Sequence, residues 1–452
     1  MDTLEVQALS RFDEAKLSKY HARMVITAGM GFFTDAYDLF VIGVVTALLL
    51  PIWHLSITQL AILNGASLAA AAFGAIFFGS LADKIGRKKI YGYEVLILFV
   101  GAILSACALS FTWLLLARIL VGFGIGGDYP TSAVVASENA NRRNRGFLVL
   151  LVFAMQALGL IIGPSFASLL LALHISPDIA WRVLLGFGAI PAASVFYLRK
   201  TIHESKHFKK AKSMPFEVSR MVSELAGHDD HVKIQSLTKR SLLKGKWLKY
   251  IIGTAGAWFI LDVAFYGNGI SSVLIMKTIS PHADILTHTL LSALIFLCFA
   301  VPGYFLAAMF VDKIGRKVLQ ILGFAMMAIC YALISLVPHL TEHMGYFLFV
   351  FGISFFFVNF GPNTTTFLIP SEIYPTQIRA SAHGISAAIG KVGAFIGAFF
   401  LPILLKSLGL HITLVMMATI CILGILVTFL VPEMKQVSLM KVDDEENLKF
   451  SH

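Results

Sequence analysis

The chain has 452 residues, of which 57% are hydrophobic and only 14% are charged. Soluble domains contain about 45–50% apolar and about 25% charged residues, and a chain this apolar cannot cover its surface with polar side chains in water. The composition therefore excludes a soluble domain, a disordered chain, a collagen, a coiled coil and a disulfide scaffold. It indicates an integral membrane protein.

Twelve apolar runs are long enough to cross a bilayer, which requires about 20 residues per helix. The first six predicted helices span residues 24–50, 59–81, 90–110, 113–136, 147–172 and 181–198. The second six span residues 250–276, 287–311, 317–337, 344–368, 381–405 and 411–431. We therefore predict an all-α membrane protein of two six-helix bundles, 24–198 and 250–431, with polar segments at 1–23, 199–249 and 432–452.

The formal net charge of +10 is explained by where the basic residues lie. Most of the 36 Lys and Arg residues fall in the terminal segments, the linker 199–249 and the loops that share a face with them. The opposite face includes the loops 51–58 and 280–284, which contain no Lys or Arg. By the positive-inside rule, both termini and the linker are expected in the cytoplasm. The charge therefore reflects membrane topology rather than nucleic-acid binding.

The two halves repeat one another in sequence. Asp83-Lys-Ile-Gly-Arg-Lys88 follows the second predicted helix, and Asp312-Lys-Ile-Gly-Arg-Lys317 follows the eighth. Further matches about half a chain apart are Ser137-Glu138 with Ser371-Glu372 and Arg145 with Arg379. Such internal repeats are typical of secondary transporters, whose substrate site lies near the bilayer midplane between the halves.

Ionisable side chains inside predicted membrane helices are costly and usually functional. Helix 24–50 carries Asp35 and Asp38, whose three-residue spacing places both carboxylates on one helix face. Helix 113–136 carries Arg118 and Asp128, about 15 Å apart at 1.5 Å per residue. The other members of this group are Glu94, Asp262 and Lys391.

The chemistry of these helices suits an anion. Trp258, Asp262 and Tyr266 are spaced four residues apart and so form one stripe, while Lys391 lies near the middle of helix 381–405. A lysine among hydroxyl, indole and amide donors suits an oxyanion, but neighbouring carboxylates repel an anion unless they carry protons. We therefore predict a site that binds an anion together with protons. The candidate donors are Tyr129, Gln156, Trp258, Tyr266 and Asn363.

Two motifs carry a resemblance to a known family. Gly79-x-x-x-Asp83-x-x-Gly86-Arg87-Lys88, in a layout of six plus six helices, resembles the cytoplasmic loop motif of the major facilitator superfamily. Gly126-Gly-Asp-Tyr-Pro-Thr-Ser-Ala-Val-Val-Ala-Ser-Glu138 is similar to the signature of the phosphate:proton symporter family within that superfamily, and Gly31-Phe-Phe-Thr-Asp-Ala-Tyr-Asp38 extends the likeness. The resemblance covers essentially the whole chain. It implies the major facilitator fold and import of inorganic phosphate with protons by alternating access.

The resemblance also implies three groups of site residues. Phosphate would be held by Tyr129, Gln156, Trp258, Asp262, Tyr266, Asn363 and Lys391. The proton pathway would comprise Asp35, Asp38, Glu94, Arg118, Asp128 and Asp262. The cytoplasmic gate would comprise Asp83, Arg87, Glu138, Arg145, Asp312, Arg316, Glu372 and Arg379.

Cofactors and partners follow from the same likeness. The four Cys residues lie in apolar runs and the fourteen His residues form no cluster in the sequence, so we expect neither a metal nor another cofactor. The expected partners are inorganic phosphate, protons and the lipid bilayer, with arsenate accepted because its size and charge resemble those of phosphate. We expect a monomer in the cell membrane and no nucleic-acid partner.

The residues leave other interpretations open. The aromatic side chains also fit simple packing, Gln156 and Asn363 also fit hydrogen bonding between helices, and Glu94 also fits a side chain that reaches towards the cytoplasm. Arg118 also fits a structural ion pair with a carboxylate. The basic run Arg87-Lys88-Lys89 also fits a role in membrane topology alone.

Two further functions also stay open. One is a related porter for a sugar or an organic anion, although a buried lysine beside carboxylates disfavours a neutral sugar. The other is a phosphate sensor that does not transport, for which the linker 199–249 is the candidate output surface. An enzyme is disfavoured, because the sequence shows no nucleophile–base pair and no Gly-x-x-x-x-Gly-Lys nucleotide loop.

Overall fold

The computed structural model describes residues 14, 16–199, 242–439 and 441–442, without the side chains of Arg87 and Lys89. Most of the predicted linker and much of both predicted terminal segments therefore lie outside the described residues. Within the described ranges the regular structure is entirely helical and contains no strand. The prediction of an all-α protein is confirmed.

The N-terminal half contains six predicted spans, two of which are each built from two consecutive helices. Its elements are α2 (Lys19–Ile52), α3 (Ile57–Ile85), α4 (Arg87–Ile90), α5 (Tyr93–Ala106), α6 (Phe111–Glu138), η1 (Arg142–Asn144), α7 (Arg145–Ala154), α8 (Gln156–Ala172), α9 (Pro177–Phe187) and α10 (Ala189–Arg199). The sixth span ends at Arg199, one residue beyond its predicted end, and this residue proves important below.

The C-terminal half repeats this plan. Its elements are α12 (Gly245–Ile270), α13 (Ser272–Ile279), α14 (Ile285–Ile295), η3 (Phe296–Ala300), α15 (Val301–Ile314), α16 (Arg316–Leu336), η4 (Leu340–Glu342), α17 (Met344–Phe360), α18 (Pro362–Ile373), α19 (Arg379–Ser407) and α20 (Gly409–Thr428). Among the described residues, eleven helices are long and apolar enough to cross a membrane. The predicted span 90–110 corresponds to α5, which has 14 residues and is therefore shorter than the others.

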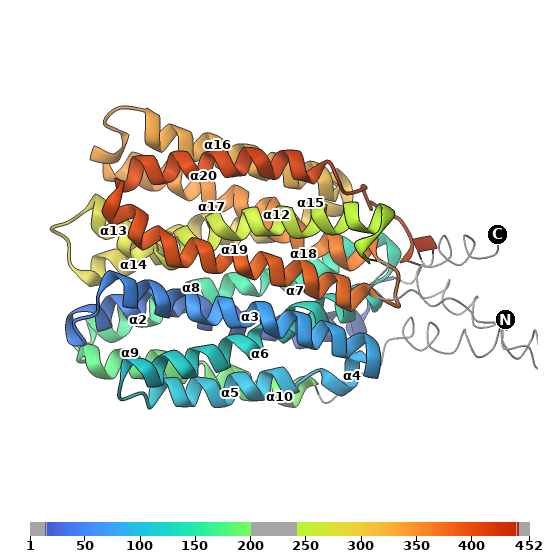
Figure 1. Cartoon of the computed structure of the whole chain (residues 1–452), viewed down its shortest axis with the longest axis horizontal. Coiled ribbons are helices and arrows are strands. Elements are labelled where there is room, and N and C mark those ends of the chain that lie inside the picture. The colour runs from blue at the N-terminus through green and yellow to red at the C-terminus, as the bar shows by residue number, and fades with distance from the viewer. Residues whose placement is uncertain (1–13, 15, 200–241, 440, 443–452) are drawn as a thin grey trace, which may run out of the picture.

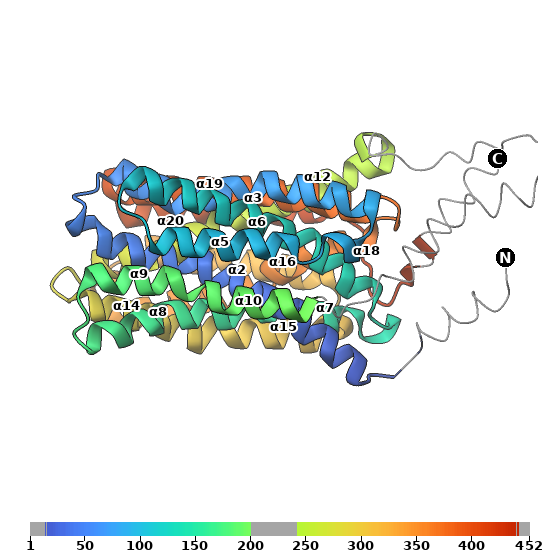
Figure 2. The same ribbon diagram turned by 90° about the horizontal axis from the view of Figure 1, so that it is seen from below.

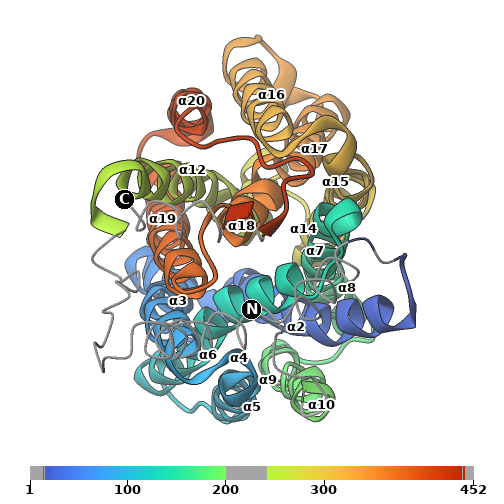
Figure 3. The same cartoon turned by 90° about the vertical axis from the view of Figure 1, so that its right-hand side faces the viewer.

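The helices run along one axis of an elongated bundle (Figure 1). The start of α2 and the end of α20 lie at the same end of the bundle, which we call the inner end, and the opposite end is the outer end (Figure 2). Viewed along the axis, α2–α10 and α12–α20 form two groups that face each other (Figure 3). Exposed apolar side chains such as Phe73 (72% exposed) and Leu116 (62%) line the outside of the bundle, as a lipid-facing surface requires.

Local sequence explains where several helices begin at the outer end. The side chain of Ser56 accepts a hydrogen bond from the backbone N–H of Gln59 (3.2 Å), and that of Ser110 accepts one from Trp113 (3.3 Å). Asp284 caps α14 in the same way through the N–H of Thr287 (2.8 Å). Each cap satisfies a backbone donor that has no partner inside its own helix.

The repeated sequence Asp-Lys-Ile-Gly-Arg-Lys folds identically in both halves. Gly86 ends α3 with φ 102° and ψ 154°, and Gly315 ends α15 with φ 110° and ψ 155°. A side chain would strain this backbone conformation, which glycine adopts readily. The repeat in sequence is therefore a repeat in structure.

The two halves pack closely along α3 and α19. A Cβ atom added to Gly79 would lie 2.7 Å from the carbonyl oxygen of Ala380, and one added to Gly384 would lie 2.5 Å from that of Ala75. Glycine is therefore required at both positions for the helices to approach this closely. This contact brings the N-terminal half against the helix that carries Lys391.

Candidate functional site

The seven side chains predicted to bind phosphate are all buried, and they come from both halves of the bundle. Helices α6 and α8 provide Tyr129 and Gln156, whereas α12, α18 and α19 provide the rest. The structure brings all seven into one region between the halves, because six are linked by the hydrogen bonds described next and the seventh packs against them.

Lys391 is the charged centre of this region. Its Nζ donates to Oδ2 of Asp262 (3.2 Å) and to the hydroxyl of Tyr266 (2.9 Å). The same ammonium lies 4.2 Å from the ring centroid of Tyr129 and 4.3 Å from that of Tyr266, so two aromatic faces also stabilise its charge. The lysine, 1% exposed, is thus surrounded by a carboxylate and two phenols.

A chain of hydrogen bonds continues from this lysine across the two halves. The hydroxyls of Tyr129 and Tyr266 are 3.0 Å apart, and Nε2 of Gln156 donates to the Tyr129 hydroxyl (3.2 Å). Tyr304 donates to Oε1 of Gln156 (2.5 Å), and Nδ2 of Asn363 donates to the Tyr304 hydroxyl (2.6 Å). Tyr304 was not among the predicted site residues, because a lone tyrosine in an apolar run carries no signal in the sequence.

Trp258 forms a wall of the same region. Its ring centroid lies 6.1 Å from that of Tyr129 and 5.4 Å from that of His383, and a Cβ on Gly390 would approach the indole to 2.5 Å. His383 is buried, and its Nε2 lies 3.1 Å from the carbonyl oxygen of Phe367. Apolar and aromatic groups therefore close the site on the side of α18 and α19.

The membrane carboxylates of the N-terminal half form two separate ion pairs. In the first, Nη2 of Arg118 donates to the backbone oxygen of Asp38 (2.7 Å), and its Nη1 lies 3.5 Å from Oδ1 of the same residue. Both side chains are fully buried. The structure therefore supports the interpretation that Arg118 pairs with a carboxylate, and it identifies Asp38 as the partner.

Arg199 forms the second ion pair. Its Nη2 donates to both carboxylate oxygens of Asp128 (2.6 and 2.7 Å), and its Nη1 donates to Oε1 of Glu94 (2.9 Å). The guanidinium carbon lies 4.1 Å from the ring centroid of Tyr91, and Ser132 donates to Oδ1 of Asp128. Glu94 is therefore a buried, paired carboxylate, so the interpretation that it reaches towards the cytoplasm is wrong.

Arg199 was not among the predicted site residues, because it falls in the polar linker predicted at 199–249. A signal was nevertheless present: the predicted helices 24–50, 90–110 and 113–136 contain four carboxylates that need buried cations, and Arg199 directly follows an apolar run. Helix α2 leaves room for it at Gly31, where a Cβ would lie 2.0 Å from Nη2 of Arg199 and 2.1 Å from Oδ2 of Asp128. Glycine at this position therefore makes the ion pair possible.

Asp35 lies one helical turn after Gly31 and differs from the other carboxylates. It is 2% exposed, and its Oδ2 has no hydrogen-bond partner among the described residues. An ionised carboxylate in such a place is costly. Of the carboxylates on α2, Asp38 has an arginine partner, so Asp35 is the better candidate for a group that binds and releases a proton.

The inner end holds the predicted gating residues. Asp83, in the last turn of α3, accepts hydrogen bonds from the backbone N–H groups of Ala380 (3.3 Å) and Ser381 (2.7 Å) at the start of α19. The symmetry-related Asp312 accepts one from the N–H of Phe147 (2.8 Å) near the start of α7. Each aspartate of one half therefore caps a helix of the other half, where a negative charge is favourable.

Ion pairs reinforce these caps. Arg379 donates to Glu138 across the halves (3.1 Å), and Arg316 makes two hydrogen bonds of 2.9 Å to Glu372. Arg145 of the N-terminal half lies 4.0 Å from Glu372. The structure therefore joins seven of the eight predicted gating residues in this end; the side chain of Arg87 lies outside the described part of the chain.

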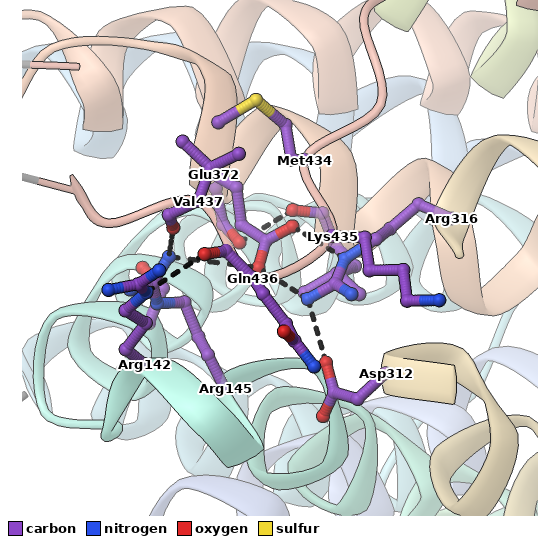
Figure 4. A network of polar contacts seen from close by, with 12 residues as sticks. Arg142, Arg145, Asp312, Arg316, Glu372, Met434, Lys435, Gln436 and Val437 are labelled. Carbon is purple, nitrogen blue, oxygen red and sulfur yellow. Dashed lines mark hydrogen bonds and ion pairs between the residues drawn. The ribbon is translucent and has the colours of Figure 1, made fainter. Parts of the chain in front are cut away.

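A segment after α20 crosses this gate. The Nε of Arg142 donates to the backbone oxygen of Gln436 (2.9 Å), and Nη1 of Arg145 donates to that of Val437 (2.9 Å), as Figure 4 shows. Glu433 accepts from the backbone N–H groups of Arg316 (3.1 Å) and Lys317 (2.9 Å). We call residues 433–437 the strap, because they belong to the C-terminal half and contact both halves.

Comparison with known proteins agrees with this architecture. Residues 24–445 match the family model described as "Sugar (and other) transporter". The chain is 36% identical to "Probable inorganic phosphate transporter 1-6" of Arabidopsis thaliana, with 97% of this chain and 96% of that protein covered. It is also 36% identical to "Inorganic phosphate transporter 1-1" of Oryza sativa subsp. japonica, with 98% and 97% covered.

Solved structures support the fold independently. The structure of the proton:xylose symporter XylE bound to 6-bromo-6-deoxy-D-glucose matches with a TM-score of 0.78 and 19% identity, over 94% of this chain and 99% of that chain. At this identity the match shows the major facilitator fold alone. Together with the nearly full-length relatives, it identifies a multi-pass membrane transporter. The chain belongs to the sugar (and other) transporter family and, within the major facilitator superfamily, to the family of phosphate symporters that its sequence resembles.

Proposed function

We propose that the protein imports inorganic phosphate together with protons by alternating access, with the anion bound between the two halves. The observation that carries this proposal is the environment of Lys391, which lies at the contact of the halves and contacts Asp262, Tyr266 and Tyr129. A buried lysine lined by phenol, amide and indole groups matches the chemistry of an oxyanion. The similar proteins described above are named inorganic phosphate transporters, which favours phosphate as that oxyanion.

The same contact suggests how a proton is coupled to phosphate. In the structure the carboxylate of Asp262 is a partner of Lys391 (3.2 Å), so a phosphate that contacts the lysine meets a second negative charge. Protonation of Asp262 removes this repulsion and frees the ammonium for phosphate. By linkage, protonation then tightens phosphate binding by the same factor as phosphate favours the proton.

The difference in pH between the two sides of the membrane sets the direction of transport in this mechanism. On release towards a more alkaline compartment, Asp262 loses its proton, pairs again with Lys391 and expels the anion. We assign Asp35, Asp38, Glu94, Arg118 and Asp128 to the proton pathway, with Asp35 as the group that titrates and Arg199 as the fixed partner of Asp128. The inner end, which carries most of the basic residues, is assigned to the cytoplasm.

In this mechanism the inner gate opens and closes once per cycle. The caps made by Asp83 and Asp312 and the pair Glu138–Arg379 join the two halves at the inner end. They must separate for phosphate to leave. These contacts therefore stabilise the state in which the inner end is closed, and their loss shifts the equilibrium towards the open state.

The test is uptake of radioactive phosphate by proteoliposomes with an imposed pH gradient, with and without a protonophore. The expected result is accumulation that requires an acidic outside and collapses when the protonophore is added. Binding without accumulation would indicate a sensor, and accumulation that sugars or organic anions block but arsenate does not would indicate another porter. Size-exclusion chromatography with light scattering tests the monomer.

A further inference from the structure

A cavity lined by both apolar and polar side chains lies at the outer end of the bundle, separate from the central site. Its volume is about 180 Å³, and residues of α2 and α3 from one half and α12, α13 and α14 from the other line it. The lining includes five polar side chains, namely Thr46, Asn64, Ser271, Lys277 and His288. A single water molecule occupies only about 10–15 Å³ of such a volume. The cavity is therefore large enough for a small anion with some of its water.

The polar groups of this outer cavity suit an anion. Lys277 is exposed and carries a positive charge, and no Asp or Glu is among the lining residues. Ser271 is 2% exposed, and its hydroxyl has no hydrogen-bond partner within the described residues. The neighbouring acid, Asp284, is engaged in capping α14, and this hydrogen bond from Thr287 lowers the pKa of Asp284.

The outer cavity leads towards the central site. Ile270, which lines it, follows Tyr266 by four residues on α12, a rise of about 6 Å. Phe40 lies between the two sites: its ring stacks on Tyr266 with centroids 5.3 Å apart, and Gly43, one turn further along α2, lines the cavity. An anion in the cavity therefore lies directly outside an aromatic barrier to the central site.

We propose that the outer cavity is a recruiting site for inorganic phosphate, occupied before the anion passes Phe40. This inference rests on the proposed function and adds a second binding site to it. The charge of Lys277 raises the local concentration of anions at the entrance, while the hydroxyl of Ser271 and the amide of Asn64 offer hydrogen bonds. Because Lys277 is exposed, binding here is weaker than at Lys391 and more sensitive to salt.

The first test compares uptake kinetics of lysine variants. Lys277→Gln should raise the KM for phosphate about two- to fivefold, as expected for one partly exposed charge contact, and leave kcat unchanged. Lys277→Arg should keep the parental KM. Lys406→Gln is the matched control, because Lys406 is an exposed lysine near the outer end of α19 and does not line the cavity. An unchanged KM in Lys277→Gln would overturn the recruiting site.

A second test separates this site from the central one. In a Lys391→Gln background, weak and salt-sensitive binding of inorganic phosphate should persist, and both Lys277→Gln and Ser271→Ala should reduce it. Loss of all binding in Lys391→Gln alone would overturn the inference. If the parent itself takes up no phosphate, the proposed function fails instead.

The lipid composition distinguishes inorganic phosphate from the headgroup of an anionic phospholipid, which also offers a negatively charged phosphate group. The kinetic comparison is made in vesicles of phosphatidylcholine alone and in vesicles that also contain phosphatidylglycerol. The KM effect of Lys277→Gln should appear in both. An effect confined to the anionic vesicles would assign the cavity to a lipid headgroup and contradict the proposal.

Discussion

Arg199→Gln removes the guanidinium that bridges two buried carboxylates. In the parent, Arg199 donates two hydrogen bonds to Asp128 and one to Glu94, at 2.6–2.9 Å, and all three side chains are at most 2% exposed. Breaking a buried ion pair by removing one partner costs about 3–5 kcal/mol, because an uncompensated charge is left behind. We expect the variant to lose stability on this scale.

The loss should depend on pH, since a protonated carboxyl group carries no charge. A buried carboxylate left without its cation is costly only while it is ionised, so the deficit of the variant should be smaller near pH 5 than near pH 8. The assay is thermal unfolding of purified protein in detergent across this range, together with phosphate uptake. A parent-like unfolding temperature at every pH would refute the reasoning.

Two further variants sharpen this experiment. Arg199→Gln combined with Glu94→Gln and Asp128→Asn removes all the opposed charges, and it should recover much of the stability because neutral replacement of a buried ion pair is often tolerated. Arg182→Gln is the matched control. The side chain of Arg182 is 30% exposed, lies 3.8 Å from Asp178 and donates to the backbone oxygens of Ala106 (3.1 Å) and Ala108 (2.7 Å). Its loss leaves no buried carboxylate unpaired, so it should cost less than the loss of Arg199 and should not vary with pH in the same way.

The remaining predictions concern the central site, the gate and helix packing. Lys391→Gln should remove the high-affinity component of phosphate binding in isothermal calorimetry and leave only the weak, salt-sensitive binding at the outer cavity, because charge-assisted hydrogen bonds contribute about 1.5–3 kcal/mol each; near-parental affinity would remove Lys391 from the site. Asp262→Asn imitates the protonated acid, so it should bind phosphate with little dependence on pH between about 5 and 8 and fail to accumulate it; accumulation like the parent's would transfer the coupling role to another carboxylate. Asp83→Asn weakens the cap on α19, and it should lower transport more than binding, whereas equal losses would indicate a folding residue. Gly31→Ala should disturb the Arg199 ion pair and lower both stability and uptake, while Gly163→Ala, whose Cβ would meet Val41 at an ordinary 3.6 Å, should change neither.

Much of the fold follows from the sequence, because the bilayer imposes strong rules. A span needs about 20 apolar residues, and polar groups inside it need partners. The apolar runs therefore predict the helices, and the internal sequence repeat predicts the two halves. The residues around Lys391 could be named because their types and spacing form a pattern. The roles of these residues are still predictions.

Other features depend on tertiary contacts that the sequence does not display. Arg199 follows an apolar run at a point where a polar linker was equally plausible, and only the packing of α10 against α5 and α2 shows that its side chain lies inside. Tyr304 is one aromatic residue among many until its hydroxyl is seen between Gln156 and Asn363. The outer cavity is lined by residues of five helices. The lining residues of any one helix form no motif in the sequence.

The strap has a consequence for handling the protein. Residues 433–437 tie the chain end to Arg142 and Arg145 of the opposite half and cap the start of α16. A truncation before Glu433 therefore removes several hydrogen bonds, each contributing about 0.5–1.5 kcal/mol, from the interface that opens in the proposed mechanism. A C-terminus shortened to this point would therefore alter the balance of conformations rather than serve as a neutral handle.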